Sequence, residues 1–380
     1  MSASLTQQDR ITVIDSLRGF ALLGILILHA VSSDVWFFTK VPAEGGAFAM
    51  KLNHLLDTFI SEAMSNKFNT IFNLLFGVSF YIMLSRAEAK GIDFRWRFEW
   101  RLAVLILIGY FHEIIFPLEA LLPYGVIGLP LVLFWKMKKN WILVFAVACL
   151  LLSPFSNDIV NLLGLGTNSV EAVEFVEKPQ FNSAIALFQY NMAHLQSPFS
   201  VLLNLDWFLK IFGLFLLGFY VASIGFFNNI QHKKKMYWSI LLISFAMYLF
   251  FRLGAHYLLD NLYWYTHYCL SATYICGFIL LYTTQAKKVL AYMEPYGKLG
   301  LTNYIMQSVF GLLVFAPFFL GVNYLSSACN VLVAFAIYSF QVMLSIWWLR
   351  HFTYGPFEWI WRSATYLKII PFRKKKNKQP

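Results

Sequence analysis

The first apolar stretch of the chain carries three side chains that can bind ions or exchange protons: Asp15, Arg18 and His29. An ionisable group at the centre of a bilayer-spanning helix costs about 2.5–3.5 kcal/mol, so such groups are retained where they pair and serve a function. Asp15 and Arg18 stand three residues apart on one helix face, where each can neutralise the other. His29 lies 14 residues after Asp15, which corresponds to about 21 Å along a helix axis and places it near the opposite end of the same helix. One helix is therefore expected to present polar chemistry at both sides of a membrane.

A second set of acid–base side chains gathers at the outer ends of the predicted helices. A histidine beside a carboxylate can hold one imidazole tautomer and act as a general base toward a hydroxyl or an amine. An isolated histidine at a helix end is also typical of an interfacial or capping group, and that alternative stays open. The set consists of His29, Asn66, Asn69, His112, Glu113, Glu119, Tyr124, Arg252 and His256. Among these, His29, His112 and Glu119 are predicted to line a site.

The inner ends of the helices carry a smaller polar group. Asn303 and Gln307 are four residues apart and share a helix face, as do Glu358 and Arg362. The same residue types also join helices by hydrogen bonds inside membranes, and for Asn303 and Gln307 that structural role is slightly favoured. The full inner group is Asp15, Arg18, Thr302, Asn303, Gln307, Glu358 and Arg362.

The composition defines the fold class. Of 380 residues, 59% are hydrophobic and only 13% are charged, which is more apolar surface than a soluble core can hide. We predict an all-α integral membrane protein. Lys and Arg outnumber Asp and Glu by 30 to 19, but the basic residues lie in short breaks between apolar runs and do not indicate nucleic-acid binding. The four cysteines show no CxxC spacing, so neither a disulfide nor a metal site is predicted.

Apolar runs of membrane-spanning length predict a bundle of about ten transmembrane helices. Lys and Arg concentrate in every second break, which places both termini in the cytoplasm by the positive-inside rule. The break at 118 is expected to form a tight outer hairpin. The runs lie at 14–33, 67–85, 101–117, 119–136, 141–157, 202–225, 236–256, 262–284, 300–320 and 328–350.

The chain divides into one transmembrane domain over 1–350 and a cytoplasmic interfacial helix with a basic tail over 351–380. Segment 158–201 is expected outside the membrane. Its amphipathic part near Ala184 to His194 fits either a lid on the membrane surface or a connecting loop. Trp359 and Trp361, followed by PFRKKKNK, are typical of a segment that lies at an anionic membrane surface.

Three islands in the chain resemble the YeiB-type family of bacterial inner-membrane proteins. They are IDSLRGFALLGILILHA at the start, NLLFG to HEIIFPLEALLPYG (73–125), and LTNYIMQS (301–308) with YGPFEWIWRSATY (354–366). Each island alone is weak, but the three occur in the family order across nearly the whole chain. The resemblance implies a bacterial cytoplasmic (inner) membrane location. It also implies membership of a transmembrane acyltransferase superfamily with heparan-α-glucosaminide N-acetyltransferase and bacterial surface-glycan O-acetyltransferases.

Two positions depart from the family pattern. The family usually has Asn where this chain has His29, and a Gly-Asp pair where it has Leu118 and Glu119. The second change keeps the carboxylate. The first creates an Arg18-to-His29 spacing that resembles the opening of the O-acetyltransferases, and so strengthens the implied acyl transfer.

The resulting hypothesis is an acyltransferase that moves an acyl group, acetyl being the expected one, from cytoplasmic acyl-coenzyme A to an extracytoplasmic glycan or lipid-linked acceptor. Arg18 would attract the donor phosphates, and His29 would act as base or acyl carrier. His112 and Glu119 would orient the acceptor, and Asn69 or Asn303 would donate to the oxyanion. Asp15, Gln307, Arg252, His256, Glu358 and Arg362 complete the predicted substrate-binding set, with no metal.

The competing hypothesis is a transporter or flippase for an anionic or lipid-linked solute, in which the same groups form gates along a path. The sequence shows neither a half-to-half repeat nor matched broken helices, which lowers that interpretation. The expected partners are the lipid bilayer and the acceptor, with no nucleic acid. Exposed glycine and aromatic faces also permit a homodimer.

Overall fold

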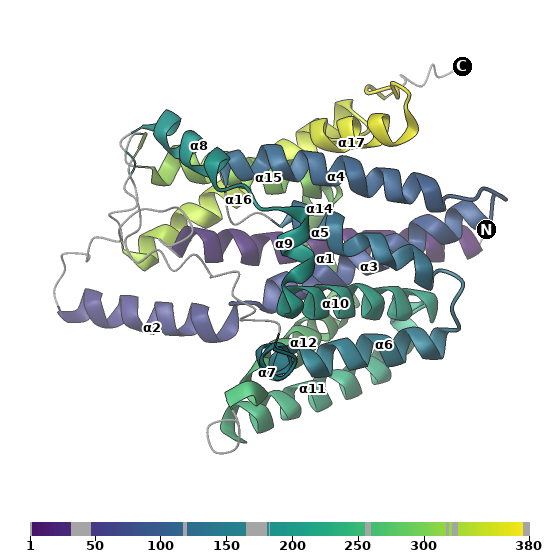
Figure 1. Cartoon of the computed structure of the whole chain (residues 1–380), viewed down its shortest axis with the longest axis horizontal. Coiled ribbons are helices and arrows are strands. Elements are labelled where there is room, and N and C mark those ends of the chain that lie inside the picture. The colour runs from purple at the N-terminus through teal and green to yellow at the C-terminus, as the bar shows by residue number, and fades with distance from the viewer. Residues whose placement is uncertain are drawn as a thin grey trace.

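The chain folds into a bundle of helices, shown in Figure 1. The computed structural model describes residues 2–31, 47–116, 120–164, 181, 183–254, 260–316, 319–320 and 326–374. No β-strand occurs in these ranges, and their extended backbone forms one isolated bridge, between Phe352 and Arg373. The expectation of an all-α protein is therefore confirmed for the described chain.

The helices follow one another with short connections. In chain order they are α1 (Ser2–Val31), α2 (Ala47–Ala63), α3 (Lys67–Glu88), α4 (Arg95–Ile115), α5 (Leu121–Gly128), α6 (Lys139–Leu152), α7 (Ser156–Leu162), α8 (Ala184–Ala193), α9 (Pro198–Leu203), α10 (Leu205–Ser223), α11 (Lys234–Gly254), α12 (Tyr265–Tyr282), α13 (Lys287–Leu290), α14 (Met293–Lys298), α15 (Gly300–Phe315), α16 (Ser327–His351) and α17 (Pro356–Tyr366). Short 3-10 helices are η2 (Leu129–Phe134), η3 (Ser153–Phe155), η4 (Ile230–Lys233) and η5 (Asp260–Trp264).

Helix α1 runs through the centre of the bundle and contacts α3, α12, α14, α15 and α16. In the apolar window of its membrane-length part, Thr12–Val31, 72% of the residues are buried. In the corresponding window of Ile230–Gly254, which contains α11, only 11% are buried. α1 is thus the inner helix of the bundle and α11 a peripheral one. The helix that carries Asp15, Arg18 and His29 is therefore surrounded by protein, where polar side chains can find partners.

The predicted number of about ten spans is wrong. Within the described ranges, six helices are long and apolar enough to cross a membrane, and seven if the bent pair Asn261–Tyr282 and Lys287–Lys298 forms one span. The second candidate, Met50–Glu88, joins α2 to α3 and is longer than the predicted run 67–85. The structure therefore contains fewer full-length spans than the apolar runs in the sequence predict.

The missing spans have local causes. Leu121–Phe134 and Gly300–Phe315 are helical and apolar but short. The 16 residues of α15 rise about 24 Å, less than the ~30 Å hydrocarbon core. α5 passes into the 3-10 helix η2, which has a proline in its first turn. α4 begins with charged residues and carries Glu113 near its end, so its apolar part is short as well.

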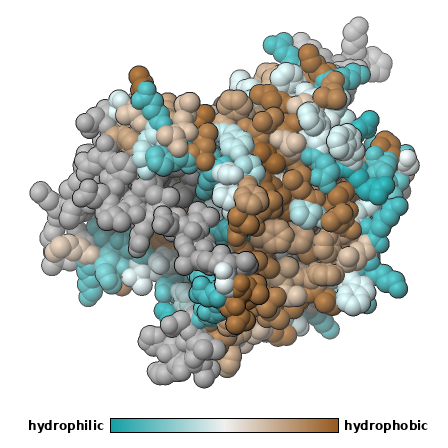
Figure 2. All heavy atoms as spheres, viewed as in Figure 1, coloured by the Kyte–Doolittle hydropathy of each residue, from teal (hydrophilic) through white to brown (hydrophobic). Residues whose placement is uncertain are grey.

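The surface has the apolar band that a membrane protein requires. Figure 2 shows hydrophobic residues spread across the face formed by α6, α10 and α11, with hydrophilic residues gathered beyond them at the end where α1 begins. Large exposed side chains in this region include Val144, Leu151, Leu242 and Phe250. A water-facing surface of this kind would aggregate, so the band indicates contact with lipid. The molecule is a multi-pass membrane protein.

Glycines bring the central helices into backbone contact. A Cβ on Gly297 of α14 would lie 1.8 Å from the Asp15 carbonyl oxygen, and one on Gly19 would lie 2.4 Å from the Met293 carbonyl oxygen. On the other side of α1, Gly77 of α3 lies equally close to the Phe215 carbonyl of α10. Small residues at such contacts are the usual means by which membrane helices approach closely. These contacts fix α1, α3, α10 and α14 against one another.

Candidate functional site

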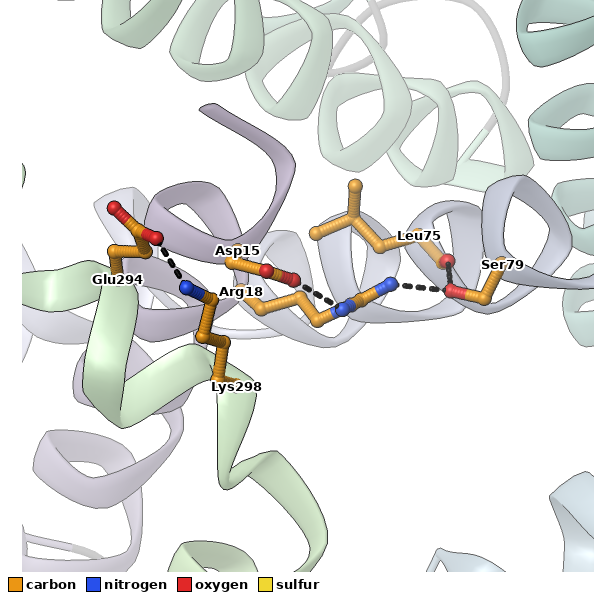
Figure 3. Close-up of polar contacts among 6 residues, drawn as sticks. All are labelled: Asp15, Arg18, Leu75, Ser79, Glu294 and Lys298. Atoms are coloured by element: carbon orange, nitrogen blue, oxygen red, sulfur yellow. Dashed lines mark hydrogen bonds and ion pairs between the residues drawn. The ribbon is translucent and has the colours of Figure 1, made fainter. Parts of the chain in front are cut away.

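The Asp15–Arg18 pair forms as the sequence predicts. Arg18 Nη1 lies 2.6 Å from Asp15 Oδ1, and Arg18 Nη2 donates to Ser79 Oγ on α3 at 2.6 Å. Ser79 in turn donates to the Leu75 carbonyl at 2.6 Å. Figure 3 shows the guanidinium reaching from α1 to α3 through this chain of contacts. The Asp15 side chain is 8% exposed and the Arg18 side chain 24% exposed, so the cation keeps partial access to its surroundings.

A second ion pair lies beside the first. On α14, Lys298 donates to Glu294 one turn away, and Figure 3 shows this pair next to the start of the Asp15–Arg18 segment. The close contact of Gly297 with the Asp15 carbonyl holds α14 in this position. Together the two ion pairs form one charged cluster of two carboxylates and two cations. Its partly exposed cations are the side chains that could interact with an incoming anion.

Asn303 and Gln307 take part in a buried hydrogen-bond network. Asn303 Nδ2 donates to the Tyr296 carbonyl at 2.9 Å, and Gln307 Nε2 donates to the Leu22 carbonyl at 3.0 Å and to Tyr296 Oη at 2.6 Å. Gln341 of α16 completes the network by accepting from Tyr296 Oη at 3.1 Å. These bonds join α1, α14, α15 and α16. The arrangement supports the structural role that the sequence left open for Asn303 and Gln307.

Glu358 is placed at the N-terminus of α15. Its Oε1 accepts from the Thr302 backbone N–H at 2.9 Å, and its Oε2 accepts from Thr302 Oγ1 at 2.5 Å. Thr302 Oγ1 also accepts from the Phe357 N–H at 3.2 Å. A carboxylate in this position satisfies helix N–H groups and opposes the positive end of the helix dipole. Burial raises the pKa of Glu358, and the hydrogen bonds from Thr302 act in the opposite direction.

Arg362 contacts two aromatic rings and not Glu358. Its guanidinium is 5.0 Å from the ring centre of Tyr354 and 5.6 Å from that of Tyr366. The neighbouring Trp361 donates to the Arg101 carbonyl at 2.8 Å, and the Arg101 guanidinium lies 3.4 Å from its ring centre. These contacts attach α17 to α4. Glu358 therefore binds α15, whereas Arg362 contacts aromatic rings of its own segment, although the two residues share a face of α17.

The structure brings His29 and His112 together around one aromatic ring. The Phe116 ring centre lies 5.0 Å from that of His29 and 6.1 Å from that of His112. His112 Nε2 is 2.9 Å from Ser308 Oγ on α15, and the Tyr304 ring centre is 5.2 Å from the imidazole. His112 is buried, whereas His29 is half-buried. The more accessible imidazole is thus the one on α1.

The amphipathic part of the predicted external segment, near Ala184 to His194, packs onto this region. Asn191 of α8 donates to the Ile114 carbonyl at 2.9 Å, and the Gln196 N–H donates to Glu113 Oε1 at 2.9 Å. α8 therefore covers the end of α4 next to His112. These contacts hold α8 and the turn after it against α4, and the choice between a lid and a connecting loop stays a prediction. Segment 165–180, with its three glutamates, lies outside the described residues.

The remaining predicted residues are dispersed. Glu119, Leu118 and His256 lie outside the described residues. Asn69 is exposed near the start of α3. Arg252 forms a two-point ion pair with Glu62 of α2, with Nε–Oε2 and Nη2–Oε1 distances of 3.1 and 3.0 Å. Tyr263 donates to the same carboxylate at 3.1 Å, so Arg252 belongs to a group distinct from the contacts of the two histidines.

Sequence reasoning missed several partners. Ser308 follows Gln307 directly in the LTNYIMQS motif, yet nothing in the spacing indicates that it bonds to a histidine 196 positions away. Ser79 and Phe116 stand in apolar runs that predict only helix. No cluster of three metal-ligating side chains occurs in the ranges that the structure describes. Cys149, Cys269, Cys276 and Cys329 are free thiols.

The fold and the polar groups within it define an all-helical, multi-pass membrane protein with acid–base residues near both ends of the membrane-length part of a buried central helix. Residues 225–368 match a family described as "Protein of unknown function (DUF418)". The chain belongs to the YeiB-type family. No solved structure matches it.

The similarity to relatives extends over nearly full length. An "Uncharacterized 39.9 kDa protein in amylase 3'region" of Bacillus acidopullulyticus is 32% identical, with 97% of each chain covered. YxaH of Bacillus subtilis (strain 168) is 28% identical, again over 97% of each chain. YeiB of Escherichia coli (strain K12) is 25% identical over 94% of this chain and 96% of its own.

Proposed function

We propose that this protein transfers an acyl group from cytoplasmic acyl-coenzyme A to a hydroxyl or amine of an acceptor on the outer side of the bacterial cytoplasmic membrane. The observation that supports it is that His29 and His112 both lie against Phe116, at the opposite end of the membrane-length part of α1 (Thr12–Val31) from Arg18. A general base and an anion-binding cation on one buried helix are what a two-sided transfer requires.

In this proposal, Arg18 attracts the phosphates of the donor. Guanidinium groups bind phosphate in two-point geometry, and the Arg18 side chain keeps 24% exposure while Asp15 and Ser79 fix its orientation. Lys298 on α14 adds a second cation on the same side. The thioester end of the donor would extend along α1 toward His29. Asn303 and Gln307 hold the helices that surround this part of α1.

The chemical step begins with proton removal by His29. The imidazole takes the proton of the acceptor hydroxyl or amine, the acceptor oxygen or nitrogen attacks the thioester carbonyl, and the C–S bond breaks. The proton then passes to the leaving coenzyme A thiolate. His112, with Nε2 bonded to Ser308, is oriented to assist the relay or hold the acceptor. The acceptor is an extracytoplasmic glycan or lipid-linked compound.

Purified protein incubated with [¹⁴C]acetyl-coenzyme A tests the proposal. Label is expected on an added glycan or lipid fraction, and His29→Ala is expected to lower the rate about 100- to 10,000-fold, the usual contribution of a general base. His54→Ala is the matched control, because His54 is exposed on α2. Label trapped on protein instead would indicate an acyl-histidine intermediate.

Equal transfer rates for the parent and His29→Ala would refute the role of His29. If no label transfers from acetyl-, butyryl- or palmitoyl-coenzyme A, acyl transfer is rejected. Uptake or flipping of a lipid-linked anion by reconstituted protein would then favour the carrier hypothesis.

A further inference from the structure

A buried lysine at the start of α3 forms no side-chain hydrogen bond or ion pair with the described residues. Lys67, the first residue of α3, is 1% exposed. Among the described residues, only its backbone forms hydrogen bonds: its N–H donates to the Met64 carbonyl at 3.1 Å, and its carbonyl accepts from Ser271 Oγ at 2.9 Å. The Glu62 carboxylate lies within electrostatic range of Lys67 but forms no ion pair or hydrogen bond with it. A buried ammonium without a direct partner is costly, so a retained one indicates an anion that binds from outside the chain.

A second buried group faces the same region. His267 of α12 is 6% exposed, and its Nδ1 is fully buried with no hydrogen-bond partner in the described structure. The Ser271 hydroxyl that bonds the Lys67 carbonyl also bonds the His267 carbonyl, at 2.6 Å. Lys67 lies within electrostatic range of the His267 ring. The Lys67 ammonium and His267 Nδ1 therefore lie within electrostatic range of each other, and neither has a hydrogen-bond partner among the described residues.

The start of α3 adds N–H groups to this pair. Asn66 precedes the helix in the left-handed conformation, φ 61°, and its side chain forms no cap. The first N–H groups of a helix have no partners within the helix and together form an anion-binding end. A side chain at the first position tilts toward that end of its helix. The Lys67 stem therefore starts out toward the uncapped N–H groups.

The nearby carboxylates already have partners. Glu62 binds Arg252 through two contacts and also accepts from Tyr263. Asp206 pairs with Lys210 at 3.2 Å, and the Lys210 ammonium lies 4.4 Å from the ring centre of Trp264. Lys67 thus leaves this region with one positive charge in excess.

We propose that Lys67, His267 and the uncapped start of α3 bind a phosphate oxyanion. Lysine is a compact cation suited to phosphate, and a neutral imidazole N–H and helix N–H groups donate to the same oxygens. In a membrane protein, phosphate comes either from the headgroup of a lipid or from a water-soluble phosphate compound. The site is separate from the His29–His112 pair and does not depend on acyl transfer.

Thermal unfolding of the purified protein in neutral detergent tests the site. Three probes are added in turn: dioleoylphosphatidic acid, inorganic phosphate, and dioleoylglycerol, which lacks phosphate. The unfolding midpoint is expected to rise with a phosphate probe and not with dioleoylglycerol. A rise with phosphatidic acid alone assigns the lipid source, and a rise with inorganic phosphate as well assigns a soluble one.

Two variants connect the effect to the site. Lys67→Met keeps the buried stem and removes the charge, and is expected to weaken phosphate binding about tenfold or more. His267→Phe is expected to weaken it to a smaller extent. The control is Lys139→Met, because Lys139 is also the first residue of a helix but already donates to the Ser223 carbonyl at 2.8 Å.

The unfolding temperature of Lys67→Met without ligand distinguishes lost phosphate binding from lost stability. Met fills the space of the lysine stem and removes an unpartnered charge, so Lys67→Met without ligand is expected to unfold at or above the parent temperature. If the parent binds neither phosphate probe, or if Lys67→Met binds phosphate as tightly as the parent, the proposal is wrong.

Discussion

At the scale of single residues, the important distinction is between polar groups buried in hydrogen bonds between helices and polar groups that keep part of their surface exposed. The side-chain amides of Asn303 and Gln307 donate hydrogen bonds to neighbouring helices. His29 is half-buried and lies against Phe116, and Arg18 keeps part of its surface accessible. The proposed chemistry therefore belongs to the two ends of the membrane-length part of α1, Thr12–Val31, and not to the Asn303–Gln307 network.

The partners of Arg18 should differ in their importance. Ser79→Ala removes one hydrogen bond and should cost about 1 kcal/mol of folding free energy. Asp15→Ala leaves the guanidinium without its counter-charge and should cost about 2–3 kcal/mol, less than for a fully buried pair because Arg18 is partly exposed. Denaturant titration in detergent measures both. Equal costs would show that the Asp15 charge is not needed to hold Arg18.

The sequence predicted the residue-scale contacts only where they are local. The three-residue spacing of Asp15 and Arg18 determines their pairing, and the ion pair is present. Glu358 and Arg362 had similarly suitable spacing, but Glu358 binds Thr302, 56 residues away, and Arg362 lies over the nearby Tyr354 ring. Helix periodicity cannot reveal such distant contacts.

At the scale of helices, α17 is attached to the bundle through the carboxylate of Glu358. Glu358→Ala removes both bonds to Thr302 and should cost about 1–2 kcal/mol. Glu358→Gln keeps an acceptor for the Thr302 N–H and a donor for Thr302 Oγ1, and should cost less. Unfolding midpoints of the two variants in detergent check this order. The same cost for Ala and Gln would show that the carboxamide cannot replace the carboxylate.

The same contact should make stability depend on pH. The folded protein raises the pKa of Glu358 above its ordinary value of 4.5, so folding favours the protonated form. That contribution is fully present below pH 4.5 and is lost as pH rises through the raised pKa. The midpoint of Glu358→Gln relative to the parent should therefore increase with pH over this interval. A difference that does not change with pH would contradict the raised pKa.

Close helix contacts should tolerate no added volume. In Gly297→Ala the new Cβ would lie 1.8 Å from the Asp15 carbonyl oxygen, so α1 and α14 must separate. We expect destabilisation of about 1–3 kcal/mol or more. Gly300→Ala is the control three residues away, where the nearest atom is 3.9 Å from the added Cβ. Similar unfolding midpoints for the two variants would show that the helices yield easily.

At the scale of the whole molecule, composition predicted the all-α membrane class correctly and the number of spans incorrectly. Each predicted apolar run contains helix in the described chain. Hydropathy alone cannot show that α15 stops after 16 residues, or that the chain bends by 109° between Asn261–Tyr282 and Lys287–Lys298. Such breaks depend on how neighbouring helices satisfy the freed backbone groups.

The positive-inside pattern makes a topological prediction. Lys90 and Ala193 are both exposed, in the basic break after α3 and in the proposed outer segment. In a background with the four native cysteines replaced by alanine, Ala193→Cys should react with a membrane-impermeant maleimide in intact cells. Lys90→Cys should react only after the membrane is opened. Labelling of Lys90→Cys in intact cells would invert the orientation and with it the donor side of the proposed reaction.

The backbone contacts between α1 and α14 also restrict how this protein can move. With Gly19 and Gly297 seated against opposing carbonyl oxygens, neither helix can slide or rotate past the other without separating first. Any conformational cycle must therefore carry the two as one rigid body, and a rocking motion that opened a passage between them would have to break this joint. Movement that admits a substrate is more easily supplied by the lightly buried helices at the periphery, such as α11.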